Sequence, residues 1–129
     1  MRTQLKSLAG TALAAACLLS SPVSSRAAKE SVTVIARFVA TPGREAELEA
    51  RLLKTVEFVR KAEPAYTYRL HRSSKDPSVF LFYEIYPSQA AVDQHSNVTL
   101  PASRREFGPL AEGLLARPPE IERFTALTE

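Results

Sequence analysis

The chain has 129 residues, 45% of them hydrophobic, and its 17 basic side chains outnumber the 14 acidic ones. That length and composition suit one domain with a modest core. The single cysteine, Cys17, excludes a framework of disulfides within the chain.

Residues 1–27 have the pattern of a secretory signal peptide. Arg2 and Lys6 precede an uncharged apolar run over residues 7–20, and small residues at Ser25 and Ala27 occupy the −3 and −1 positions of a cleavage site. The run is shorter than the roughly 20 residues of a membrane span. We therefore expect an exported protein, periplasmic or secreted, with no membrane association after cleavage.

Lipidation is the alternative fate of the leader. The segment Ala14–Cys17 resembles a lipoprotein cleavage box, but it lacks the usual leucine three residues before the cysteine, and the apolar run continues beyond it. Cleavage after Ala27 is therefore preferred to modification of Cys17.

Cleavage at this point removes the excess positive charge. Arg2, Lys6 and Arg26 leave with the leader, so residues 28–129 keep 14 basic and 14 acidic side chains and no cysteine. The basic isoelectric point therefore predicts no nucleic-acid surface. The mature domain also cannot use thiol chemistry.

The mature domain begins with a strand and a long helix. Residues 32–40 are apolar at nearly every position, as in a central strand that is covered on both faces. After a Thr-Pro-Gly turn, residues 44–62 predict a helix of about five turns that Pro64 ends. Its apolar stripe consists of Leu48, Leu52, Val56 and Val59.

Two strands joined by an Asp-Pro turn follow. Residues 66–72 and 79–86 are rich in β-branched and aromatic side chains, which is typical of an antiparallel hairpin. Alternation places Glu84 on one face with Phe82 and Tyr86, so we expect a partly buried carboxylate that needs a partner. Arg37 and Arg69 are the candidate partners.

The last third of the chain predicts two helical segments and a strand. Ser88 is a plausible N-cap of the first helix, which we expect Asn97 to end. A further helical piece starts near Pro101, is kinked or divided at Gly108-Pro109, and has Phe107, Leu110 and Leu114 as its stripe. Residues 121–127 form the last predicted strand.

The predicted order, βαββαβ, is that of the ferredoxin-like α+β fold. The sheet of this fold carries helices on one face only, and its other face would here expose large apolar side chains to water. We therefore expect a homodimer in which two sheets face each other and close into a dimeric α/β barrel.

Several segments in this order resemble the antibiotic biosynthesis monooxygenase (ABM) domain family, which includes small quinol monooxygenases. The order and spacing of the segments carry the resemblance, and it extends over most of the mature chain. The segments are residues 32–37, 42–45, 62–72, 76–80 and 83–86, together with His95 and Phe107.

The resemblance implies a small oxygenase that uses O₂ without flavin, haem or metal. A quinol-like or polyphenolic substrate must then be bound in a mostly dry pocket and deprotonated. The family's usual tryptophan is replaced by Tyr86, and Ala65 stands where glycine is usual. The absence of tryptophan from the whole chain argues against the related haem-degrading enzymes.

His95 is the first choice for the catalytic base, because imidazole can be neutral and accept a proton near pH 7. The alternative is a histidine on the helix surface, and His71 is expected to be a solvated strand residue. Two isolated histidines predict no metal site. The pocket is expected to use Tyr68, Tyr83, Tyr86, Glu84 and Arg37, with Glu84 and an arginine alternatively forming a structural ion pair.

Two functions therefore remain open on the sequence. One is a cofactor-independent monooxygenase that acts on a small aromatic substrate with O₂. The other is a non-catalytic dimeric barrel that binds a small aromatic or apolar ligand.

Overall fold

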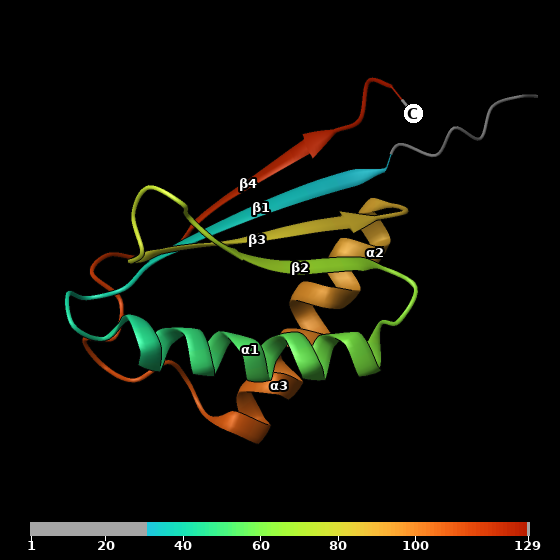
Figure 1. Cartoon of the computed structure of the whole chain (residues 1–129). Helices are drawn as coiled ribbons and strands as arrows, with labels where there is room; N and C mark the ends of the chain where they lie inside the picture. Colours follow the sequence, from blue (N-terminus) through green and yellow to red (C-terminus); the bar gives the residue numbers. More distant parts are fainter. Residues whose placement is uncertain (1–30, 129) are drawn as a thin grey trace, which may run out of the picture.

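The computed structural model describes residues 31–128, so the predicted signal peptide and Cys17 lie outside the described residues. Four strands form one sheet in the order β2-β3-β1-β4, with every neighbouring pair antiparallel (Figure 1). They are β1 (Val32–Val39), β2 (Thr67–Arg72), β3 (Val79–Tyr86) and β4 (Glu120–Thr125). The predicted ferredoxin-like α+β topology is confirmed.

The helices lie on one face of the sheet (Figure 1). They are α1 (Glu45–Ala62), α2 (Gln89–Gln94), the π-helical turn η1 (His95–Thr99) and α3 (Leu100–Phe107). Between the helices and the sheet, the predicted stripe of α1 packs on side chains of β1, β2 and β3. Each of its four members is at least 94% buried: Leu48, Leu52, Val56 and Val59.

The register of the strands fixes which side chains face the helices. Val34 pairs with Glu84 and Ala36 with Phe82, and these residues are buried on the helix side. Ile35 pairs with Tyr83 and therefore points to the opposite face of the sheet. Tyr83 is 36% exposed and Phe124 of β4 is 47% exposed, so this open face presents apolar side chains to solvent.

The second helical region differs from the prediction at Asn97. Ser88 caps α2 as expected, because its hydroxyl accepts a hydrogen bond from the Ala91 amide at 3.2 Å. Asn97, however, does not end the helix: the backbone stays right-handed from His95 to Leu100. One wide turn, η1, joins α2 to α3, and helical structure continues to Phe107.

Gly108 ends α3 with backbone angles of φ 78° and ψ 171°. Leu110 and Leu114 therefore lie beyond the helix and do not continue its stripe as predicted. Leu114 is nevertheless buried in the core, because its carbonyl accepts a hydrogen bond from the Thr41 amide and holds the loop against the end of β1.

Between residues 31 and 128, no helix is long and apolar enough to cross a membrane.

Candidate functional site

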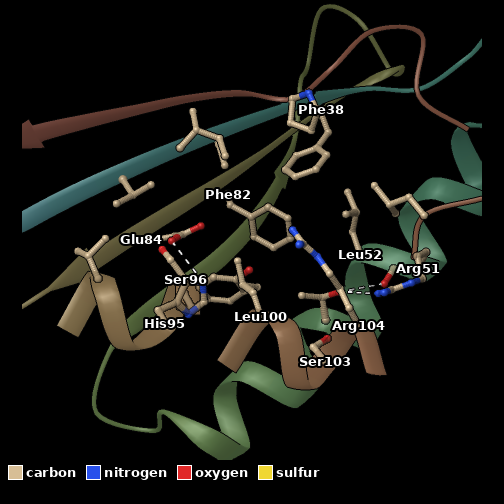
Figure 2. A pocket seen from close by; sticks show the side chains of 18 of the residues that line it. Phe38, Arg51, Leu52, Phe82, Glu84, His95, Ser96, Leu100, Ser103 and Arg104 are labelled. Atoms are coloured by element: carbon tan, nitrogen blue, oxygen red, sulfur yellow. Dashed lines mark hydrogen bonds and ion pairs between the residues drawn. The ribbon is translucent and has the colours of Figure 1, made fainter. Parts of the chain in front are cut away.

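A cavity of about 230 Å³ lies between the helix face of the sheet and the helices. Side chains from all four strands and from α1, α2, η1 and α3 line this cavity (Figure 2). Phe38, Leu52, Phe82 and Leu100 make much of that wall apolar. Cavities of roughly 150 Å³ already admit benzene, so this one has room for a small substituted aromatic compound.

His95 lines the cavity and is 2% exposed. Its Nδ1 lies 2.7 Å from Oε2 of Glu63, whose other oxygen accepts a 2.7 Å hydrogen bond from the Thr99 hydroxyl. Because an ionised carboxylate can only accept, the hydrogen of the neutral imidazole belongs on Nδ1. The lone pair of Nε2 is then available, and Nε2 is buried without a hydrogen-bond partner among residues 31–128.

Glu84 provides a second titratable group beside this nitrogen. Its side chain lines the cavity, is almost completely buried and accepts a 2.7 Å hydrogen bond from the Tyr86 hydroxyl. The Glu84 Oε2 atom is 3.9 Å from Nε2 of His95, beyond hydrogen-bond length. Burial raises the pKa of Glu84 above its ordinary value, against the opposing effects of Tyr86 and His95.

Two tyrosines enclose the histidine. The rings of Tyr68 and Tyr86 each have their centres 5.3 Å from the centre of the His95 ring. Burial, followed by the charge of Glu84, raises the pKa of both phenols well above the usual value. Both therefore stay protonated at neutral pH and can donate hydrogen bonds but cannot act as bases.

The predicted site residues divide between the two faces of the sheet. Tyr68, Glu84 and His95 line the cavity, and Tyr86 is buried behind Glu84 as its hydrogen-bond donor. Tyr83 does not belong to this group. It is one residue before Glu84 and three before Tyr86, so its side chain points to the opposite face of the sheet, where it pairs with Ile35.

Arg37 is the other correction. It lies on the open face of the sheet, paired with Leu81, and its guanidinium is 3.6 Å from a carboxylate oxygen of Glu120. It therefore neither lines the cavity nor pairs with Glu84. Among the described residues, the one basic side chain within 4.0 Å of the Glu84 carboxylate is His95, which the helices supply.

The wide turn η1 supplies both polar side chains that meet Glu63. His95 is its first residue and Thr99 its last, and the His95 carbonyl accepts a hydrogen bond from the Leu100 amide. Such π-helical turns are rare and occur often at functional sites. Here the turn brings a ring nitrogen and a hydroxyl to the two oxygens of one carboxylate.

Glu63 was missed by the sequence analysis, although the sequence holds a signal for it. It is the C-cap of α1 and is 8% exposed. A negative charge is unfavourable at a helix C-terminus, where the helix dipole favours cations. A buried acid in that position therefore indicates that another element provides its partners.

The sequence analysis also missed other polar residues of the wall, among them Arg51, Ser103, Arg104 and Arg123. Arg51 lies within an amphipathic helix, four residues after Glu47, which is the spacing of an ordinary surface ion pair. In the structure Arg51 instead donates to Thr55 at 2.6 Å and to the Gly108 carbonyl at 2.7 Å. Within residues 31–128, no three metal-ligating side chains cluster as an ion site would need.

The profile of the antibiotic biosynthesis monooxygenase family matches residues 31–99, which is more than half of the chain. The chain belongs to this family. The match covers the strand β1, helix α1, the hairpin of β2 and β3, and the turn that carries His95. No curated protein sequence matches the chain significantly.

Solved structures of similar fold include ABM-related proteins. PA3566 from Pseudomonas aeruginosa is 28% identical with a TM-score of 0.64, over 77% of this chain and 96% of that one. A Caulobacter crescentus protein, proposed to be an antibiotic biosynthesis monooxygenase, is 27% identical with a TM-score of 0.63, over 78% and 92%. SnoaB, a cofactor-independent oxygenase from Streptomyces nogalater, is 18% identical with a TM-score of 0.59, over 78% and 96%, and shares the fold.

Proposed function

We propose that this ABM-family protein is a cofactor-independent monooxygenase that hydroxylates a small quinol-like or polyphenolic substrate with O₂. One observation carries the proposal: Nε2 of His95 is buried, unpartnered within the described residues, and on the wall of a mostly apolar cavity. Membership of the family and the description of SnoaB as a cofactor-independent oxygenase support the same reaction class.

The first step is removal of a proton from a substrate hydroxyl. Nε2 of His95 accepts this proton, and the carboxylate of Glu63 stabilises the imidazolium that results. The electron-rich phenolate can then reduce O₂, which reacts slowly with the neutral phenol. The apolar wall keeps water from this anion until O₂ has reacted.

The electrons balance without an added reductant. One oxygen atom forms a C–O bond to the ring, the O–O bond breaks, and the other oxygen leaves as water. A quinol gives four electrons in becoming a hydroxyquinone, which equals the four that O₂ takes up. The substrate therefore supplies every electron that a flavin or metal would otherwise carry.

Isotope labelling tests this reaction directly. Purified protein (residues 28–129) and a panel of quinols in flavin-free buffer with chelator should take up ¹⁸O₂ and give a hydroxyquinone heavier by one labelled oxygen atom. Formation of unlabelled quinone with hydrogen peroxide would indicate simple oxidation. Ligand binding without any oxygen uptake across the panel would favour the non-catalytic barrel.

A further inference from the structure

The cavity wall has an excess of positive charge. Three arginines line it, Arg51, Arg104 and Arg123, against one carboxylate, Glu84. Within residues 31–128 none of the three arginines forms a salt bridge: the ion pairs found there involve other side chains. Arg51 is half-buried, whereas Arg104 and Arg123 are exposed overall. The guanidinium groups are therefore accessible to an anion that enters the cavity.

Arg51 and Arg104 form the core of this cationic region. Burial, and then the positive charge of Arg104, lowers the pKa of Arg51. The Arg51 group is held in place by its bonds to Thr55 and Gly108 and by the Phe107 ring, whose centre lies 5.6 Å from its central carbon. Its Nε remains buried with no partner in the described chain.

Ser103 adds an unused hydroxyl to the same wall. The residue is 1% exposed, and its Oγ has no hydrogen-bond partner among residues 31–128. Buried hydroxyls are almost always hydrogen-bonded, so each exception needs an explanation. Within residues 31–128, buried side-chain atoms without partners occur on Arg51, His95 and Ser103, and all three residues line this one cavity.

These groups lie apart from the proposed base. In Figure 2, Glu84 and His95 lie on one side of the cavity and Arg51 on the other, and Arg104 reaches from α3 toward the space between them. Phe82 and Leu100 provide apolar surface in the same region. A ligand that satisfies both sides needs a neutral, oxidisable hydroxyl at one end and an anion at the other.

We infer that the substrate is a quinol that carries a carboxylate, which Arg51, Arg104 and the Ser103 hydroxyl bind while the ring hydroxyl faces His95. The inference rests on the proposed function for the identity of the oxidised end. Planar guanidinium groups match carboxylates with paired hydrogen bonds. The carboxylate would also offset the positive charge of the two arginines.

Matched ligands test the anion site separately from the reaction. Calorimetric titration under argon compares 2,5-dihydroxybenzoate with 2,5-dihydroxybenzamide, which has nearly the same shape but no charge. The acid should bind at least roughly tenfold more tightly, since hydrogen bonds to charged groups are the stronger kind. Arg104→Gln should remove this preference and leave the affinity for the amide within about twofold.

Arg105→Gln is the matched control, because Arg105 is exposed on the same helix and is not part of the cavity wall. It removes the same charge and should keep the preference for the acid. Equal affinity for acid and amide in the unmodified protein, or equal loss in Arg104→Gln and Arg105→Gln, would overturn the inference.

Oxygen uptake with the same compounds separates the two proposals. Selective binding of the acid without oxygen uptake would uphold the anion site and count against oxygenation. Oxygenation of uncharged quinols with no preference for the acid would uphold the proposed function and overturn the carboxylate site.

Discussion

Two short hydrogen bonds connect Glu63, at the end of α1, to the turn η1 that carries the proposed base. Glu63 receives the Nδ1 hydrogen of His95 and the hydroxyl of Thr99, each at 2.7 Å, and it does not line the cavity itself. Its proposed role is therefore to position the imidazole and to stabilise the imidazolium, without touching the substrate.

Glu63→Gln tests this positioning role. The amide keeps the shape but loses the charge, so kcat should fall at least roughly tenfold. KM should change little, because Glu63 does not line the cavity and does not touch the substrate. Glu57→Gln, on the exposed side of α1, should change neither quantity. An unchanged kcat in Glu63→Gln would contradict the role.

Glu84 makes the stability of the fold depend on pH. Burial raises its pKa in the folded protein above the ordinary value of 4.5. The folded state therefore binds the proton more tightly than the unfolded chain does. Below pH 4.5 the contribution of this group to the free energy of unfolding should not change with pH. As the pH rises through the folded pKa, the free energy of unfolding should fall by up to about 1.4 kcal/mol per pH unit.

Glu84→Gln removes that loss, because the amide can still accept from Tyr86 but never ionises. In urea unfolding between pH 4 and pH 8, the free energy of unfolding of the variant should increase relative to that of the unmodified protein as the pH rises. Glu106→Gln, an exposed change on α3, serves as the control and should follow the unmodified protein. A difference that stays constant over this range would show that Glu84 does not titrate as described.

At the scale of elements, the end of α3 depends on one glycine. The φ of 78° and ψ of 171° at Gly108 belong to a region that is essentially restricted to glycine. The added Cβ would meet no atom within 4 Å, so backbone strain alone sets the cost of a substitution. Gly108→Ala should lower the free energy of unfolding by about 1–3 kcal/mol. A loss below about 0.5 kcal/mol in urea titrations would contradict this conformation.

The sequence predicted the order of elements because each has its own period. The α1 stripe repeats at helical spacing and the hairpin strands alternate, and both patterns survive in the structure. The helix boundaries after Ser88 were harder to predict, because the short α2 and the wide turn η1 follow no single helical period. Asn97 was read as a helix end for that reason.

The site was predictable in part. Alternation correctly grouped Glu84 with Tyr86, but it could not decide which face of a sheet with two apolar faces meets the helices. Tyr83 and Arg37 were assigned to the pocket through that ambiguity, and the register places both on the open face. An acid at the C-terminus of a helix, as Glu63 is, indicates partners on another element, but no local pattern identifies His95 as that partner.

At the level of the whole molecule, the apolar side chains on the open face of the sheet indicate how the protein assembles. Ile35, Leu81, Tyr83 and Ile85 share it by register, and Phe124 of β4 joins them. Because apolar surface of this kind is usually buried against a partner, we propose a homodimer in which two such faces meet. Export through the leader of residues 1–27 stays a prediction from the sequence.

Light scattering after gel filtration tests the dimer. At micromolar concentration the mature protein should have the mass of two chains, and Tyr83→Arg should shift it to the mass of one. Leu53→Arg places the same charge on an exposed site of α1 and should leave the dimer intact. A monomeric unmodified protein, or dissociation by the Leu53 change alone, would contradict this assembly.

The central claim is that His95 acts as the base of a cofactor-free oxygenation. The most direct test is the rate of oxygen uptake with an accepted quinol for the unmodified protein, His95→Gln and His71→Gln, since the chain has only these two histidines. His71 of β2 pairs with Leu81 on the open face of the sheet, away from the cavity, and is therefore the matched control. We expect His95→Gln to lose roughly a hundredfold or more in kcat while His71→Gln keeps the full rate. A folded His95→Gln protein that retains the unmodified rate would contradict the claim.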